Sequence, residues 1–238
     1  MDGDKELNSL LNLNWLYIDP EGTLWEIGKK GKIFRYDHIH DTFELVYRLP
    51  IEDFRDLPAP ISFSWIDRNN HIWLCNEETI FLYNTCTGQV TQVKNSLSEA
   101  INDIEQIDES HFFIGTEVGI HHAQLKDNTL QLLPCDKLDN VNIQVNDLHF
   151  DPKIRKLFIG AFQRGIMVYD MKTKMVTQPE VSLKDVSISR IKPLNAKELL
   201  IATDGGGIYK MNVETYQTEP FIVADYNSYN GMNGNSIN

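Results

Sequence analysis

The chain has few of the residues that mark several large classes of protein. Its 238 residues include only three cysteines, Cys75, Cys86 and Cys135, which are too few and too irregularly spaced for a zinc framework or a disulfide scaffold. No run of about 20 apolar residues exists to span a bilayer, and residues 1–5 lack the features of a signal peptide. We therefore expect no bound metal and no direct insertion of this segment into a membrane.

Positive charge is also scarce. There are 22 basic residues against 34 acidic ones, so the formal net charge is −12. Binding to nucleic acid or to an anionic membrane depends on a cationic surface that releases counterions or meets acidic lipids. The composition therefore predicts neither kind of partner.

Catalytic motifs are missing as well. Five residues separate Gly22 from Gly28 where a phosphate loop needs four, and no Ser or Thr follows Lys29. No Gly-x-Ser-x-Gly elbow is present. His38 and His40 lie in an expected hairpin turn where Asp37 and Asp41 are the only nearby carboxylates. We expect no cofactor, no metal site and no catalytic residue.

What the chain does contain is an internal repeat. The unit WLYIDPEGTLW at residues 15–25 returns in altered form about every 45 residues. The aromatic or apolar residues that mark the second strand of each copy are Trp25, Trp73, Phe113, Phe158 and Leu200, at intervals of 48, 40, 45 and 42 residues. This period fits the four-stranded blades of a β-propeller, and we expect the second-strand aromatics to pack between neighbouring blades.

Each copy also reads as β-structure by itself. An alternating strand, a polar turn, a second aromatic-rich strand, then a glycine and a third strand follow one another, and a fourth, outer strand completes the unit. No segment has the length and periodicity of a substantial helix; residues 97–107 come nearest. The sequence predicts an all-β fold, a β-propeller with about five blades in one domain, 1–238. The expected repeats are 13–60, 61–100, 101–144, 145–187 and 188–226, with 227–238 as the start of a sixth.

The last residues extend this pattern. Ser236-Ile237-Asn238 resembles the segments 100–103 and 144–147, each of which opens a repeat. We therefore expect a piece of a longer protein. An incomplete propeller exposes two blade edges, which predicts either closure as a five-bladed ring or pairing of chains through those edges.

Four motifs together resemble a known repeat. They are Ile-Asp-x-x-Gly-x-Leu-Trp (18–25), Phe-Ile-Gly-Thr-x-x-Gly-Ile (113–120), Ala-Thr-Asp-Gly-Gly-Gly-Ile-Tyr (202–209) and the tail Asn-Gly-x-x-Gly-Asn-Ser-Ile. They look like the two-component-regulator propeller repeat of the periplasmic sensor domains of hybrid two-component system histidine kinases from gut Bacteroidetes. The second copy departs from the pattern, with Leu74-Cys75-Asn76 where Ile-Gly-Thr is usual.

This resemblance implies a function. It implies a piece of a larger, seven-bladed propeller, in a periplasmic domain of an inner-membrane sensor that recognises an oligosaccharide and signals to a kinase outside this segment. It also implies a homodimer in the intact protein and no enzyme activity in this segment. Two alternatives stay open, a propeller enzyme acting on a glycan and a scaffold that binds only protein.

Ligand-binding residues are expected at one mouth of the propeller. There the loops between the second and third strands meet the loops that lead into the innermost strand, and loops carry function on a rigid scaffold. A sugar site needs an aromatic face and fixed polar groups. The expected ligand-binding residues are Trp65, Gln163, Arg164, Arg190 and Asp204. The wider set on these loops adds Lys29, Lys30, Glu77, Glu78, Glu117, Asn102, Asp103, Asn146 and Asp147, although the Asn-Asp pairs can also be read as turn caps.

Overall fold

The computed structural model describes an all-β chain. The described residues are 13–28, 30–49, 61–76, 79–97, 99–135, 137–138, 141–179, 183 and 186–223. They contain strands and turns but no α-helix, and accordingly no helix long and apolar enough to cross a membrane. The prediction of an all-β fold is confirmed for this part of the chain.

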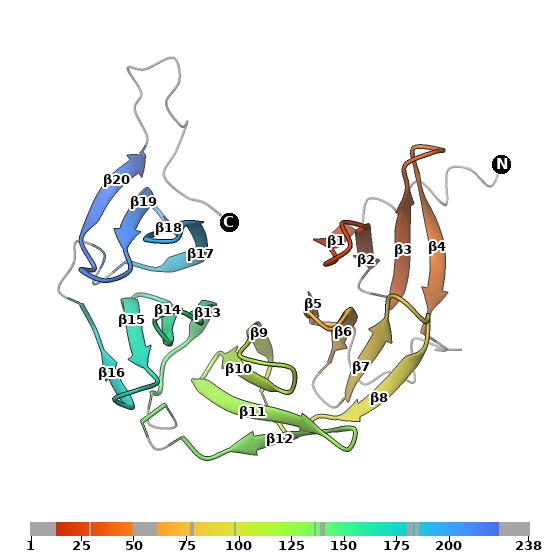
Figure 1. Ribbon diagram of the computed structural model, residues 1–238, viewed down its shortest axis with the longest axis horizontal. Coiled ribbons are helices and arrows are strands. Elements are labelled where there is room, and N and C mark those ends of the chain that lie inside the picture. Colours follow the sequence, from red (N-terminus) through yellow and green to blue (C-terminus); the bar gives the residue numbers. More distant parts are fainter. Residues whose placement is uncertain are drawn as a thin grey trace. The chain divides into compact units, whose positions relative to one another are not determined.

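The described residues form twenty strands, which follow one another in groups of four, in the order that the repeats predict (Figure 1). The first group is β1 (Leu13–Ile18), β2 (Leu24–Gly28), β3 (Lys32–Asp37) and β4 (Thr42–Arg48). The second group is β5 (Phe63–Ile66), β6 (His71–Cys75), β7 (Thr79–Asn84) and β8 (Val90–Lys94). The third group is β9 (Ile101–Gln106), β10 (His111–Thr116), β11 (Ile120–Lys126) and β12 (Thr129–Leu133).

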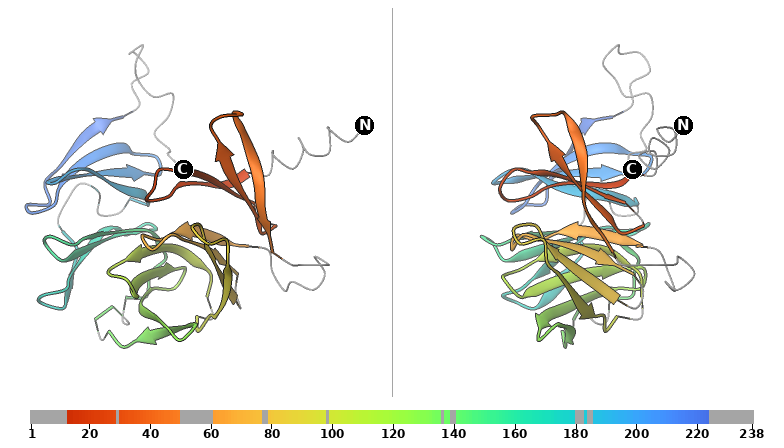
Figure 2. Two further views of the ribbon diagram at one scale, coloured as in Figure 1. Left: turned by 45° about the vertical axis from the view of Figure 1, so that its right-hand side comes forward. Right: turned by 90° about the vertical axis from the view of Figure 1, so that its right-hand side faces the viewer.

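The remaining two groups have the same composition. The fourth is β13 (Val145–Asp151), β14 (Lys156–Ala161), β15 (Gly165–Asp170) and β16 (Met175–Thr177). The fifth is β17 (Ile188–Asn195), β18 (Glu198–Thr203), β19 (Gly207–Asn212) and β20 (Thr218–Ile222). In every group the first two strands are antiparallel, and so are the second and third. Each sheet is visibly twisted (Figure 2), as β-sheets of L-residues are.

The chain divides into two compact units. The first comprises residues 1–100 and 125–131, and the second comprises 101–124 and 132–238. Within the first unit, Lys94 N donates to Asn128 O at 3.1 Å, and Thr129 pairs with Lys94 in parallel. Within the second unit, the first strands β9, β13 and β17 lie side by side (Figure 1).

The turn between the first and second strands is built around an aspartate in the first two groups. Asp19 Oδ1 accepts from Thr23 N at 2.7 Å, and its Oδ2 accepts from the indole Nε1 of Trp25 at 2.8 Å. Asp67 likewise accepts from His71 N at 2.8 Å and from the indole of Trp73 at 2.9 Å. Because a buried indole N–H needs a partner, the six-residue step from aspartate to tryptophan follows from the geometry of this turn.

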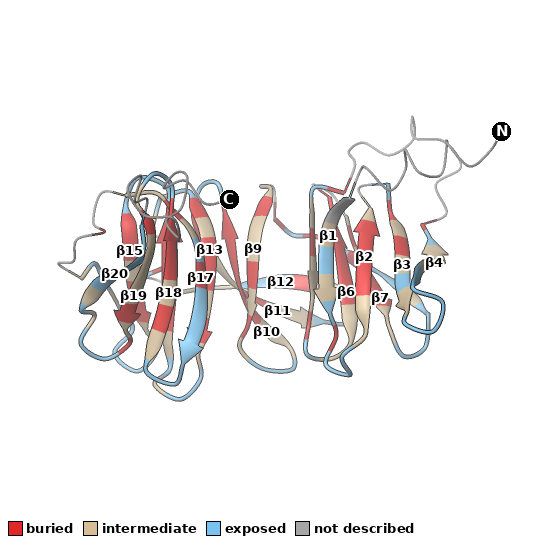
Figure 3. Ribbon diagram, turned by 90° about the horizontal axis from the view of Figure 1, so that it is seen from above, coloured by how far each residue is buried: buried red, intermediate tan, exposed pale blue. Residues whose placement is uncertain are grey.

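The marker residues of the repeat are core residues. Trp25, Trp73, Phe113 and Phe158 are all buried. Trp25 packs with residues of the second group, Phe113 with residues of the fourth and Phe158 with residues of the fifth. Most residues of the second strands are buried, as Figure 3 shows for β2, β6 and β18, whereas β20 is largely exposed. A single sheet cannot bury both faces alone, so the prediction that these aromatics pack between neighbouring sheets is confirmed for Trp25, Phe113 and Phe158.

Candidate functional site

A polar pocket of about 350 Å³ lies in the second unit, where the first strands of three sheets begin. Its walls are Asn102 from β9, Asn146 from β13, Ser189 and Arg190 from β17, and Gln144, just before β13. Three consecutive repeats thus contribute equivalent positions to one pocket, which we call the mouth pocket.

A β-bulge sets the direction of these side chains. In β9, Ile101 and Asp103 pair with successive residues of β10, so Asn102 is the extra residue. The same shift leaves Asn146 as the extra residue in β13 and Ser189 in β17. A bulge re-aims a side chain and occurs often beside functional sites. Three bulges at equivalent positions therefore place three small polar side chains at one end of the sheets.

The two asparagines are held in fixed orientations. Asn102 Nδ2 donates to Val145 O at 2.9 Å, and Asn146 Nδ2 donates to Ile188 O at 2.8 Å, each on the first strand of the next sheet. Gln144 Nε2 donates to the side-chain oxygen of Asn146 at 3.3 Å. The asparagines thus link neighbouring sheets, and their side chains do not cap turns.

The aspartates that follow the asparagines link the same strands. Asp103 Oδ2 accepts from Leu148 N, and Asp147 Oδ2 accepts from Ile191 N, both at 2.7 Å. Burial raises the pKa of Asp103 well above its usual range, and the nearby charge of Asp147 raises it further. Burial also raises the pKa of Asp147, against the opposing charge of Lys192. These carboxyl groups hold the sheets together and lie beneath the mouth pocket.

Arg190 takes the place of the aspartate in the fifth repeat. It pairs with Ala202, as Asp103 pairs with Gly115 and Asp147 with Gly160. Its Nη1 donates to Ser189 O at 2.8 Å, and its Nε lies 3.8 Å from Asp147 Oδ1. The side chain is 55% exposed. A guanidinium group therefore lines the mouth pocket at a position where the two preceding repeats carry a carboxyl group.

Two loops adjoin the pocket. Gln163, in the turn between β14 and β15, donates its N–H to Ser187 Oγ at 3.0 Å, and Asp204, after β18, donates its N–H to Ser187 O at 2.9 Å. Phe162 N donates to Gln144 O at 3.0 Å, and the Phe162 side chain is 44% exposed. The loops between the second and third strands therefore meet the start of the first strands, as the sequence predicted for this mouth.

The five expected ligand-binding residues lie in different parts of the structure. Arg190 lies in the mouth pocket, and Gln163, Arg164 and Asp204 lie exposed in the two adjoining turns. Trp65 is a partly buried residue of β5 in the first unit, with its ring 5.8 Å from that of Trp73. The structure therefore brings together four of the five residues at one end of the second unit, and Trp65 belongs to the other unit.

Sequence reasoning missed Phe162, Gln144 and Ser189. Phe162 is the one exposed aromatic in the β14–β15 turn, and no local sequence signal distinguishes it from a buried phenylalanine at a strand end. Of the wider set, Glu117 is exposed in the β10–β11 turn and Lys30 lies in the β2–β3 turn. Lys29, Glu77 and Glu78 lie outside the described residues.

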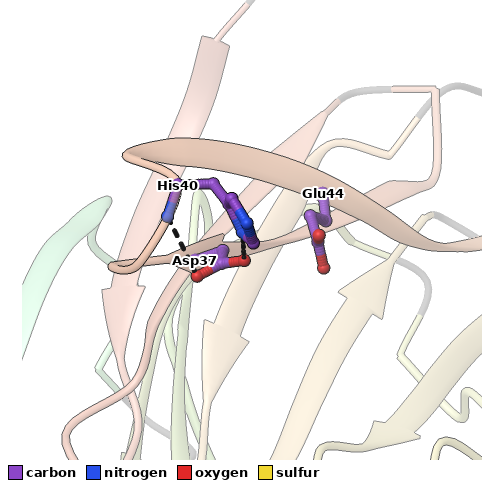
Figure 4. Close-up of side chains that lie close together, drawn as sticks. All are labelled: Asp37, His40 and Glu44. Carbon is purple, nitrogen blue, oxygen red and sulfur yellow. Dashed lines mark hydrogen bonds and ion pairs between the residues drawn. The ribbon is translucent and has the colours of Figure 1, made fainter.

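One group of possible metal ligands lies outside the pocket. Asp37, His40 and Glu44 lie on the β3–β4 hairpin with ligand atoms within 4.8 Å of one another (Figure 4). His40 Nδ1 is 2.6 Å from Asp37 Oδ2, and Glu44 also pairs with Arg35 at 3.8 Å. The hydrogen bond to His40 lowers the pKa of Asp37 to about 2 and raises that of His40. These contacts form an exposed ion pair that stabilises the hairpin turn.

Comparison with known proteins connects the fold to solved structures. No protein-family model and no curated protein matches the chain. The extracellular domain of BT4673 from B. thetaiotaomicron, described as a one-component system, matches with a TM-score of 0.69 and 21% identity, over 94% of this chain and 29% of that one. The extracellular domain of the hybrid two-component system BT3049 from the same organism matches with a TM-score of 0.69 and 22% identity, over 94% and 30%.

A third structure extends the comparison to another kingdom. Sqt1 of Saccharomyces cerevisiae matches with a TM-score of 0.65 and 16% identity, over 92% of this chain and 66% of that one. The chain spans about 30% of the length of the two bacterial domains that it matches. The likeness inferred from the repeat motifs thus extends to the fold, which is similar to that of extracellular domains of two-component system proteins.

Proposed function

We propose that this chain is part of the periplasmic sensor domain of a hybrid two-component system and that it binds an oligosaccharide at the mouth pocket. The repeat motifs and the similarity to extracellular domains of such systems support the sensor assignment. The five groups of four strands then form part of a larger, seven-bladed propeller in a protein anchored in the inner membrane. The kinase lies outside this chain, and the chain itself has no catalytic role.

The observation that carries the ligand assignment is the set of three aligned bulges. They place Asn102, Asn146 and Ser189 at equivalent positions on the wall of one pocket. The exposed ring of Phe162 lies in the adjoining turn, whose backbone is bonded to Gln144. A pyranose has an apolar face and a rim of hydroxyl groups, so an aromatic ring beside fixed amides suits it.

Signalling follows from the way the pocket is built. Its walls come from three sheets that are joined by side-chain hydrogen bonds from Asn102, Asp103, Asn146 and Asp147. A ligand that contacts all three sheets favours the arrangement of the sheets to which it binds most tightly. The population of that arrangement rises only as far as the ligand's affinities for the different arrangements differ. We propose that this shift changes the association of two sensor chains in a homodimer.

Thermal unfolding against a panel of defined oligosaccharides tests the proposal. A ligand at about 100 times its Kd adds about 2.7 kcal/mol to the free energy of unfolding, which raises Tm by several degrees. We expect one glycan class to raise Tm and Phe162→Ala to abolish the shift. Phe221→Ala is the matched control, because Phe221 is 46% exposed but lies on the outer strand β20. A shift that survives Phe162→Ala, or no shift with any glycan, would contradict the proposed site.

A further inference from the structure

The charge of the mouth pocket differs from that of the protein. The chain carries a formal net charge of −12, yet the residues that line the pocket are two asparagines, a glutamine, a serine and an arginine. Among these lining residues Arg190 is the only charged side chain. A neutral sugar does not require a cation at this place, so the guanidinium group points to a charged feature of the ligand.

The exchange of aspartate for arginine in the fifth repeat sharpens this point. Asp103 and Asp147 each accept a backbone N–H of the next first strand, and an arginine has no acceptor with which to make such a bond. At this position the fifth repeat therefore has the N–H donors of a guanidinium group in place of a carboxylate that accepts a backbone hydrogen bond. Only Nη1 donates within the described residues, to Ser189 O, and Nε faces Asp147. The Nη2 edge is left for a ligand.

The groups around Arg190 leave part of its charge unbalanced. Asp147 is its nearest carboxyl group, but Nε and Oδ1 are 3.8 Å apart, and Asp147 Oδ2 is already bonded to Ile191 N at 2.7 Å. Lys192 lies two residues further along β17, on the same face of the strand. The exposed carboxylate of this region, Asp204, lies in the adjoining turn and does not line the pocket. The field at Arg190 is therefore suited to an anion.

Ser189 supplies a second donor beside the guanidinium. Its hydroxyl oxygen is buried and makes no hydrogen bond within the described residues, although a buried hydroxyl without a partner costs free energy. Ser189 is also the bulged residue and lines the pocket next to Arg190. A rotation of the Ser189 side chain toward the pocket would let an oxyanion bound to Arg190 accept from both groups. Arg is well suited to planar, charge-assisted recognition of carboxylate or sulfate.

We propose that the ligand is an acidic oligosaccharide and that its oxyanion, a uronate carboxylate or a sulfate ester, binds to Arg190 and Ser189. This inference rests on the proposed function, because it specifies the class of sugar that the mouth pocket selects. The asparagines and Phe162 bind the sugar ring, and Arg190 selects for the negative charge.

Isothermal titration calorimetry on the intact chain with matched pairs of sugars tests the inference. One pair is a uronic acid disaccharide and its neutral hexose counterpart, and the other is a sulfated disaccharide and its desulfated counterpart. We expect one acidic member to bind at least about 10-fold tighter than its neutral counterpart, since a hydrogen bond to a charged group is worth about 10- to 100-fold in affinity. That preference should fall as NaCl is raised.

The variant Arg190→Gln should remove the preference for the acidic member. Arg155→Gln is the matched control, because Arg155 is an exposed arginine in the β13–β14 turn of the preceding sheet and does not line the pocket. Arg190→Lys, which keeps the charge but not the planar fork, should retain part of the preference, and Ser189→Ala should weaken binding of the acidic member selectively. These two variants keep the test valid if Arg190→Gln does not fold.

The outcomes separate the inference from the function on which it rests. If the neutral members bind as tightly as the acidic ones, or if Arg190→Gln leaves the preference intact, the inference is wrong and oligosaccharide binding stands. If no saccharide binds, both are wrong. Binding of inorganic sulfate alone, without any acidic saccharide, would reveal an adventitious anion site and would also overturn the inference.

Discussion

Replacing Asp103 in two ways should have opposite effects on stability. Its Oδ2 accepts from Leu148 N at 2.7 Å, and burial raises its pKa well above the usual range. Asp103→Asn keeps an acceptor for Leu148 N and removes the charge, whereas Asp103→Ala removes the acceptor. A buried N–H left without a partner costs about 1–3 kcal/mol. For a chain of this size that loss lowers Tm by about 2–12 °C.

The sign of the pH dependence follows from the raised pKa. Below the ordinary pKa of an aspartate, near 4, the carboxyl is protonated in both the folded and the unfolded chain. As pH rises, the unfolded chain loses this proton first, so the carboxyl lowers the free energy of unfolding progressively until the pH passes its folded pKa. The slope can reach about 1.4 kcal/mol per pH unit. Asp103→Asn should therefore equal or exceed the wild-type stability at pH 7.

Urea unfolding followed by circular dichroism between pH 4 and pH 8 measures both effects. The difference between Asp103→Asn and wild type should grow with pH, and Glu214→Gln, which changes an exposed carboxylate in the β19–β20 turn, should show no such growth. If Asp103→Asn is as unstable as Asp103→Ala at pH 7, the reasoning about this residue is wrong. That result would mean that the carboxylate is ionised and that its charge stabilises the contact between β9 and β13.

Three further predictions concern other parts of the chain. Asp67→Ala leaves a buried indole and backbone N–H groups without their acceptor and should cost about 1–3 kcal/mol in urea unfolding. Gly160→Ala should lower the free energy of unfolding by about 1–3 kcal/mol, because its Cβ would lie 2.7 Å from Cγ2 of the buried Ile188. Unchanged stability would show that β14 and β17 can move apart to accommodate the methyl group. In an NMR titration His40 should have a pKa above its usual range, and Asp37→Asn should lower that pKa; no change on substitution would exclude the ion pair.

Much of the fold was predictable because the same pattern of strand and turn residues occurs in each repeat. The second-strand markers, the glycine that begins β15 and β19, and the polar turns after them recur with a nearly constant period. The structure also shows a longer turn between the first two strands of the fourth repeat. The paired residues His149 and Phe158 are nine positions apart in the sequence, whereas Glu105 and Phe113 are eight apart. Local patterns of period two and turn chemistry suffice for such elements.

The site was predictable in location but not in composition. The sequence indicated the end of the sheets at which Arg190, Gln163 and Asp204 lie, because antiparallel order fixes which loops share an end. It did not reveal Ser189 or Phe162, since nothing in a linear sequence distinguishes an exposed phenylalanine at a strand end from a buried one. Exposure depends on what packs against the residue from a distant part of the chain.

The sequence by itself determined the all-β class, the four-stranded repeat, the buried aromatic markers and the acidic surface, all of which depend on residues close to one another in the chain. Only the tertiary structure decided what the Asn-Asp pairs do. Asn102 and Asp103 bond to residues 43 and 45 positions away, and Arg190 lies next to Asp147 from the preceding repeat. The bulges that direct these side chains arise from the register between strands, which no local pattern encodes.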